Sequence, residues 1–142
     1  MTSRQPGRGG PLWAAIVPLN LGLALPVQGA TRFVATSGAD GGNTCLVAGS
    51  PCRTITRALG QAVASDTISA SPGIYNLALG ETFPLTISKN LSLVDAGARS
   101  TILDATGASR TVVFVFSASV AIAELTVTGG GGELHQHREQ HL

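Results

Sequence analysis

Carboxylate side chains in the second half of the chain are the first residues that could do chemistry. Asp95, Asp104 and Glu124 stand among small or apolar neighbours, and clustered acids can act as general acid and base or bind Ca²⁺. These three lie far apart in the sequence, and no two Asp residues are adjacent. Asp is also favoured in turns, where its carboxylate accepts hydrogen bonds from backbone amides. We therefore expect Asp95 and Asp104 to be turn residues, and we predict no catalytic residue.

Three histidines near the end of the chain could bind a metal ion. His135 and His137 form a His-x-His pair, with His141 close behind, and such a pair can bind zinc or copper. The segment follows a run of glycines and has no apolar periodicity, so nothing would hold the ligands in place. We predict no metal site and no cofactor, and we expect residues 130–142 to form a disordered polar tail.

The chain contains two cysteines, Cys45 and Cys52. In an oxidising compartment a close, even pair is a disulfide more often than a metal site. Zinc would need two further ligands, and no histidine lies near in sequence. We predict a disulfide that closes a short loop and stabilises the fold by about 2–3 kcal/mol, less any strain.

The first thirty residues have the pattern of a secretory signal peptide. Arg4 and Arg8 precede an apolar stretch, Leu12–Leu25, and small residues follow it. An uncleaved membrane anchor is the alternative, but the stretch is shorter than the roughly 20 apolar residues of a spanning helix, and proline interrupts it. We predict a signal peptide over residues 1–29, cleavage after Gly29, and a secreted or cell-surface product with no membrane span.

The composition favours short strands and argues against a nucleic-acid partner. Charged residues make up 12% of the chain and aromatic residues 4%, and there are 18 glycines. Small, β-branched and turn-forming residues of this kind favour strands over long helices. The net charge is +1 and no run of Lys or Arg occurs, whereas nucleic-acid binding needs clustered cations.

Apolar periodicity predicts one helix followed by a series of short strands. Apolar residues at spacings of three and four predict an amphipathic helix over Thr54–Ala64, with Thr54 as its N-cap. The expected strands are Arg32–Thr36, Thr67–Ala70, Ile74–Tyr75, Leu85–Ile87, Leu91–Val94, Thr101–Leu103, Val112–Phe116, Val120–Ile122 and Leu125–Val127. The turns between them lack the two-residue signals of hairpins, which favours strands joined by corners into a solenoid.

Two internal echoes favour the solenoid. The segment at Leu91–Leu93 resembles that at Val120–Ile122, an offset of 29 residues (91 to 120), and Thr101–Leu103 resembles Leu125–Val127 at an offset of about 25 residues. Both offsets are within the range of solenoid repeats. A β-sandwich with irregular loops is the alternative that periodicity leaves open.

Residues 33–129 resemble the start of a right-handed parallel β-helix of the pectin-lyase-like type, as in bacterial secreted proteins with a DUF1565-type N-terminal segment. The resemblance is carried by Phe33–Asp40, Cys45, Ser50–Ile55, Ala58, Ala62, Asp66–Ile68, Ser71–Tyr75, Leu91–Leu93, Thr101–Asp104 and Leu125–Gly130. It implies an all-β solenoid over residues 30–129, with one N-terminal helix that caps the first coil through Ile55, Leu59 and Val63. Stacked strands need such a cap, because their terminal edge is otherwise open.

The same resemblance gives the expectations about function. The family includes pectate lyases, pectin lyases and polygalacturonases, which act on acidic polysaccharides through clustered acids on their middle rungs. In this chain, spacing brings no acid pair into register, and family members usually continue for many more rungs, so the chain resembles the N-terminal piece of a longer, here truncated, solenoid. We expect a non-catalytic secreted or surface module, glycan-binding or adhesin-like, whose partners are a polysaccharide or cell-surface glycan and a second copy at the C-terminal rung. The alternatives are an N-terminal fragment of a polysaccharide lyase or hydrolase, and a purely structural fragment.

The signal peptide gives the first testable prediction. N-terminal sequencing of the exported protein should find Ala30 as the first residue, because Val27 and Gly29 are the small or aliphatic residues that a signal peptidase requires before the cut. A soluble cytoplasmic product that retains Met1 would contradict the prediction.

Overall fold

The computed structural model describes residues 28–97, 99–108 and 111–131, and these form nine short strands and one helix. In chain order the elements are β1 (Thr31–Val34), α1 (Ile55–Gln61), β2 (Thr67–Ala70), β3 (Gly73–Asn76), β4 (Leu85–Ile87), β5 (Leu91–Asp95), β6 (Thr101–Asp104), β7 (Val113–Val115), β8 (Val120–Ala123) and β9 (Leu125–Thr128). The expected signal peptide (1–29) and polar tail (130–142) lie almost wholly outside the described residues, as do the three histidines.

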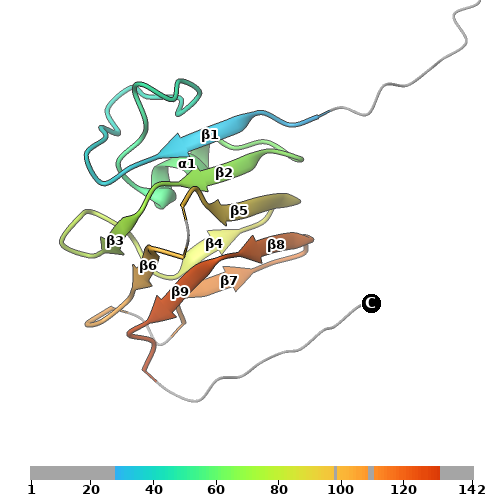
Figure 1. Cartoon of the computed structure of the whole chain (residues 1–142). Coiled ribbons are helices and arrows are strands. Elements are labelled where there is room, and N and C mark those ends of the chain that lie inside the picture. Colours follow the sequence, from blue (N-terminus) through green and yellow to red (C-terminus); the bar gives the residue numbers. More distant parts are fainter. Residues whose placement is uncertain (1–27, 98, 109–110, 132–142) are drawn as a thin grey trace, which may run out of the picture.

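The strands form three parallel sheets that the chain visits in a fixed order. One sheet has the order β1-β2-β5-β8, the second β3-β6-β9 and the third β4-β7, and every pair of neighbouring strands is parallel. Strands β2, β3 and β4 add one strand to each sheet, and β5, β6 and β7 then add the next, stacked from one end of the molecule to the other (Figure 1). Exclusively parallel pairing argues against the antiparallel β-sandwich.

The predicted elements are all present, with ends that differ by at most three residues. Both internal echoes are confirmed as neighbours in a sheet, because Leu91 pairs with Val120 and Thr101 pairs with Leu125. Within residues 28–97, 99–108 and 111–131, the prediction of a mostly β structure with a single helix is also confirmed. Similar corner and strand patterns therefore recur where one strand lies directly on the next.

The core consists of ladders of inward-pointing side chains that run across the sheets. Ile68 on β2 pairs with Leu93 on β5, and Tyr75 on β3 pairs with Leu103 on β6. All four are fully buried, and each such side chain contributes roughly 1.5–3 kcal/mol to folding. The Tyr75 hydroxyl donates a hydrogen bond to Ser71 O (2.8 Å), and burial raises the pKa of this phenol far above its ordinary value.

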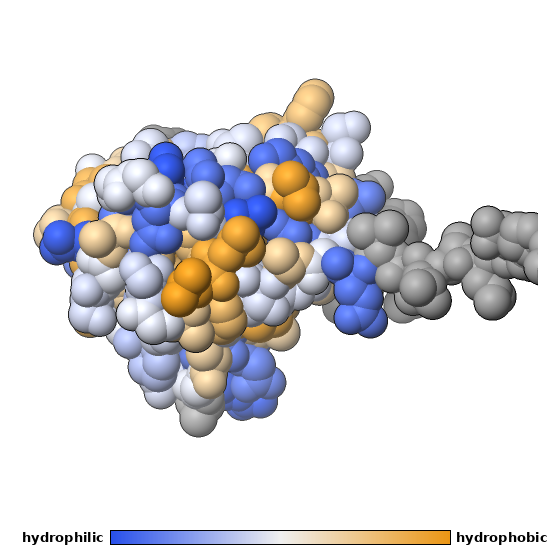
Figure 2. Space-filling view, turned by 90° about the horizontal axis from the view of Figure 1, so that it is seen from above, coloured by the Kyte–Doolittle hydropathy of each residue, from blue (hydrophilic) through white to orange (hydrophobic). Residues whose placement is uncertain are grey.

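The same ladders are open at their C-terminal end. Ile122 on β8 continues the Leu93 ladder but is 42% exposed, and Val127 on β9 continues the Leu103 ladder but is 50% exposed. Strands β7, β8 and β9 lie together at this end, opposite β1 (Figure 1). The β1 end instead shows a mostly polar surface with small, separate apolar patches (Figure 2). Within the described residues, the apolar interior is therefore covered at one end only.

Helix α1 provides that cover, although it is shorter than predicted. Thr54 is its N-cap and accepts a hydrogen bond from Arg57 N, as expected. Ile55 and Leu59 are buried, but the expectation that Val63 faces the core is wrong, since Val63 is 58% exposed. The helix ends at Gln61, and side chains bind the backbone groups that directly follow it: the Lys89 ammonium donates to Ala62 O (2.6 Å) and Asp66 accepts from Val63 N (3.0 Å).

The predicted disulfide joins Cys45 to Cys52, and both residues are fully buried. The loop that it closes is attached to β1 on both sides, since Phe33 N donates to Cys45 O (2.7 Å) and Cys52 N donates to Phe33 O (2.9 Å). The disulfide therefore fixes the segment that leads from β1 into α1.

Candidate functional site

Every acidic side chain of the described residues accepts a hydrogen bond from the chain itself. The chain has eight Asp and Glu residues, of which Glu133 and Glu139 lie outside the described ranges, and the other six are all bonded. The six are Asp40, Asp66, Glu81, Asp95, Asp104 and Glu124. Their bonding decides which of them could take part in chemistry.

Asp95 is the turn residue that its sequence context predicts. It ends β5, and its carboxylate accepts from Gly97 N (2.8 Å), Ser100 N (2.7 Å) and the Thr101 hydroxyl (2.8 Å). Desolvation raises the pKa of this carboxyl, but these hydrogen bonds outweigh it and hold the pKa below its ordinary value. Asp104 is similar, because bonds from the Thr106 hydroxyl and amide lower its pKa.

Glu124 directly follows β8, and Asp95 ends the neighbouring strand β5, so these two acids come closer together than sequence spacing suggested. They have different partners, however. The Glu124 carboxylate is 3.2 Å from Arg99 Nε in an exposed ion pair, whereas both Asp95 oxygens are occupied by the turn. An exposed pair of this kind contributes little to stability.

Two acids that sequence reasoning missed hold the N-terminus of α1. Asp40 accepts from Thr54 N (3.1 Å) and the Thr54 hydroxyl (2.8 Å), and Glu81 accepts from the amides of Ile55 and Thr56 and from the Thr56 hydroxyl. Burial raises the pKa of Glu81 in spite of these bonds. Both acids lie many residues from the helix in sequence, so no local pattern could have identified them.

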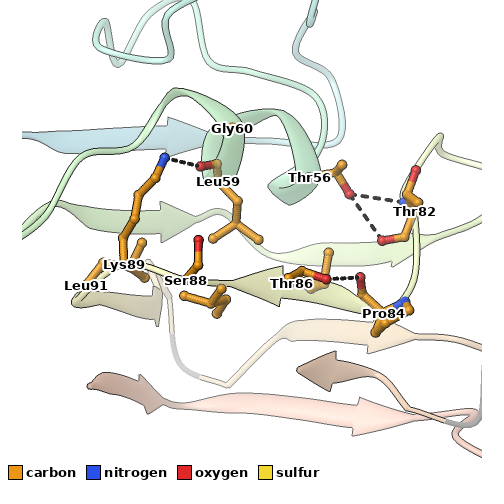
Figure 3. Close-up of a pocket in the computed structure, with 11 residues that line it drawn as sticks. Thr56, Leu59, Gly60, Thr82, Pro84, Thr86, Ser88, Lys89 and Leu91 are labelled. Atoms are coloured by element: carbon orange, nitrogen blue, oxygen red, sulfur yellow. Dashed lines mark hydrogen bonds between the residues drawn. The ribbon is translucent and has the colours of Figure 1, made fainter. Parts of the chain in front are cut away.

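A groove lies between α1 and the segment that contains β4 (Figure 3). Its volume is about 370 Å³, near the lower limit of small-molecule sites, which are roughly 300–1,000 Å³. The residues that line it are Thr56, Leu59, Gly60, Thr82, Pro84, Leu85, Thr86, Ile87, Ser88, Lys89 and Leu91. We call this the α1–β4 groove.

The polar side chains that line the α1–β4 groove differ in how many hydrogen bonds they already make within the chain. The Thr56 hydroxyl is engaged with Glu81 and Thr82 N. Lys89 reaches across to the carbonyls at the end of α1, Ala62 O and, at 3.5 Å, Leu59 O (Figure 3). Thr86 makes one long bond, 3.4 Å, to Pro84 O. Within the described residues the Ser88 hydroxyl has no hydrogen-bond partner, so Thr86 and Ser88 are the hydroxyls most available to a ligand.

Next to the groove, two exposed aromatic rings lie on the outer face of the β4–β7 sheet. Thr86 pairs with Phe114, and the neighbours of Thr86 on β4 are buried, so Thr86 and Phe114 both point outward. Phe114 and Phe116 are 48% and 62% exposed, and their rings stack with centroids 6.5 Å apart. They are the exposed aromatic residues of the described chain. Two rings and two hydroxyls therefore share one face, which we call the aromatic face.

Among the described residues, no three His, Cys, Asp or Glu side chains gather where they could hold a metal ion. The described part of the chain also has no helix long and apolar enough to cross a membrane.

Comparison with known protein families gives a match to this chain. The model of a family described as "Protein of unknown function (DUF1565)" matches residues 36–139, which is more than half of the chain. No curated protein and no solved structure matches.

The turn at Asp95 gives a prediction for acid stability. Asp95→Asn should lower Tm at neutral pH, because an amide cannot accept all the hydrogen bonds that the carboxylate accepts. Since the folded pKa lies below the ordinary value of 3.8, the stabilisation is complete above that value and is lost as the pH falls through the folded pKa. Thermal unfolding should therefore show the difference from wild type narrowing below about pH 4.

Glu124→Gln is the matched control, and its Tm should stay close to wild type because its ion pair is exposed. A difference between Asp95→Asn and wild type that stays constant into strong acid would contradict the assignment.

Proposed function

The chain belongs to the DUF1565 family, and from this premise we propose that it is a non-catalytic, extracytoplasmic β-helix module that binds glycans on its aromatic face. The observation that carries this proposal is that the two exposed aromatic rings of the described chain stack on each other, and one of them, Phe114, pairs with the exposed Thr86. The supporting steps concern the fold, the acids, the binding face and the compartment.

The proposed fold is a right-handed parallel β-helix of the pectin-lyase-like type. Its support is the strand order, in which successive strands enter the three parallel sheets in turn and never form a hairpin pair. Parallel strands linked by short corners are the construction of β-solenoids, and crossovers between parallel strands in one sheet are almost always right-handed.

The non-catalytic part of the proposal is supported by how the acids are bonded. Hydrolysis of a glycosidic bond uses two carboxyl groups that face each other across the substrate, and lyases of this class need acids that can bind Ca²⁺ or take a proton. The six described acids instead bind the backbone, hydroxyls or arginine of their own chain. Structural bonding of this extent leaves no described pair free for a substrate.

The aromatic face has the groups that a sugar chain needs. Flat apolar rings such as those of Phe114 and Phe116 stack against the C–H faces of pyranose rings, and aromatic residues commonly line ligand sites. Thr86 and Ser88 add hydroxyls on the neighbouring strand and its extension. Lys89 adds a positive charge to the adjoining groove while its ammonium donates to Ala62 O, and this charge favours a sugar with a carboxylate. We therefore propose an acidic, uronate-containing glycan as the ligand.

An extracytoplasmic location is the part of the proposal that the disulfide supports. Disulfides persist in oxidising compartments and are rare in the cytosol, and Cys45 and Cys52 form one here. The sequence of residues 1–29 adds the proposed export signal.

Titration with oligogalacturonate by calorimetry tests glycan binding. The wild-type chain should bind weakly, and Phe114→Ser together with Phe116→Ser should reduce the affinity at least tenfold, which is about 1.4 kcal/mol, because the stacking surface is lost. Lys89→Gln should weaken binding of the uronate more than binding of a neutral oligosaccharide of the same length.

Ile74→Ser is the matched control, since Ile74 is 52% exposed on β3, in a different sheet. Equal affinity of the double Phe variant and wild type would contradict the proposed face. No new reducing ends or unsaturated sugars should form, and cleavage of a uronic-acid polymer would favour the alternative, a fragment of a polysaccharide lyase or hydrolase.

The open end of the ladders gives a prediction about self-association. Strands β8 and β9 carry no charged residue or proline, the usual protection of an exposed edge, and Ile122 and Val127 are exposed there. The chain should therefore self-associate through this end in sedimentation experiments over a concentration series, and Ile122→Lys should shift it towards the monomer. Val47→Lys, at an exposed position in the disulfide loop, should have no effect. A wild-type chain that stays monomeric at all concentrations would contradict the prediction.

A further inference from the structure

The buried carboxylate of Asp66 accepts hydrogen bonds from three separate parts of the chain. Asp66 is 1% exposed. Its Oδ2 accepts from Arg32 Nε (2.7 Å) on β1 and from Val63 N (3.0 Å) after α1, and its Oδ1 accepts from Ala30 N at 2.8 Å. Desolvation raises the pKa of this carboxyl, but the hydrogen bonds outweigh it and lower the pKa below its ordinary value. Asp66 is therefore ionised at neutral pH.

Ala30 N lies directly before β1 (Thr31–Val34). Ala30 O accepts from Thr67 N (2.9 Å), so Ala30 is already attached to β2, and β1 starts at the next residue. Gly29 lies so close to the backbone of Ser65 that an added Cβ would be 1.9 Å from Ser65 O, whereas Gln28 is exposed. The bond between Gly29 and Ala30 is also the bond at which the sequence predicts signal-peptide cleavage.

We propose that cleavage after Gly29 converts Ala30 N into an α-ammonium group that forms a salt bridge with Asp66 Oδ1, so that export processing completes the buried charge cluster of the fold. This inference rests on the proposed export. In the cleavage step, water hydrolyses the Gly29–Ala30 peptide bond under the action of a signal peptidase. Gly29 leaves as a carboxylate and Ala30 keeps the nitrogen, which takes up protons to become the ammonium group.

Processing replaces a neutral amide donor by a cation at the same position. A charge-assisted hydrogen bond is roughly twice as strong as a neutral one, and Asp66 would then face two cations, the new ammonium and Arg32. The guanidinium of Arg32 also donates a second hydrogen bond, from Nη1 to Thr44 O (2.7 Å). From the segment after β4, Lys89 donates to Ala62 O, next to Val63, and Arg32 is the described titratable group that is bonded to Asp66.

The salt bridge predicts a pH dependence of stability with a definite sign. An α-amino group has an ordinary pKa of about 7.7–8.0, and a carboxylate partner raises that pKa in the folded state. The extra stability is then complete below about pH 8 and is lost as the pH rises through the higher folded value.

The test compares the chain Ala30–Leu142 with a free N-terminus and the same chain N-acetylated at Ala30 by a co-expressed acetyltransferase. Acetylation keeps an N–H donor at the same atom but removes the charge. Urea unfolding near neutral pH should give the free-amine chain a folded-to-unfolded ratio roughly five- to tenfold higher, and the two chains should converge at about pH 10. Equal stability of the two chains at every pH would overturn the proposal.

Two further measurements separate this inference from the proposed export. The Asp66→Asn chain, where it folds, should show no difference between its free and acetylated forms, and NMR titration of the Ala30 amine in the wild-type chain should give a raised pKa. An ordinary amine pKa would overturn the salt bridge even if export occurs. N-terminal sequencing of the exported product tests export alone, and a product that begins at another residue would overturn the processing step whatever the amine pKa of the prepared chain.

Discussion

The buried carboxylate of Asp66 binds three groups: the backbone amide directly before β1, an arginine side chain on β1, and a backbone amide that follows helix α1. An arginine occupies an inward-pointing position on β1, in register with the fully buried Ile68. A charge there is tolerated only if it is paired, because an unpaired buried charge costs several kcal/mol. Asp66 provides that pairing and also ends α1 by binding Val63 N. The covered end of the stacked parallel sheets therefore depends on one polar cluster as well as on apolar packing.

The β1 end of the sheets is covered and the β8–β9 end is open, and different interactions dominate at each end. At the β1 end, carboxylates and an ammonium side chain satisfy the ends of α1, so that a short helix can close the stack. At the β8–β9 end, apolar side chains continue the core ladders without a cover in the described residues. Another strand can pair with the exposed backbone at such an edge. The fold itself therefore provides the surface for the predicted self-association.

The proposed binding face also follows from the stacking. The outward position on β4, Thr86, lies between two buried ones, and the pairing of β4 with β7 places Phe114 opposite Thr86, with the ring of Phe116 stacked on that of Phe114. The acids are used elsewhere, in turns and helix caps, where they stabilise the scaffold. A chain with few aromatic residues thus presents two of them on one face, while its carboxylates serve the backbone.

The sequence by itself determined the features that depend on neighbouring residues. Turn composition and periodicity predicted the strands, Thr54 was identified as the helix cap, and Cys45 and Cys52 were predicted to pair because the loop between them is short. The echo between Leu91 and Val120 predicted a register that the sheet confirms. The end of α1 and the exposure of Val63 were missed: the Lys89 ammonium, which binds Ala62 O, comes from a segment 27 residues away, although Asp66, which binds Val63 N, is only three residues further along the chain. Only the tertiary structure decided the roles of Glu81 and Asp66 and the grouping of Phe114 with Thr86, since each of these depends on contacts between residues more than 20 positions apart in the sequence.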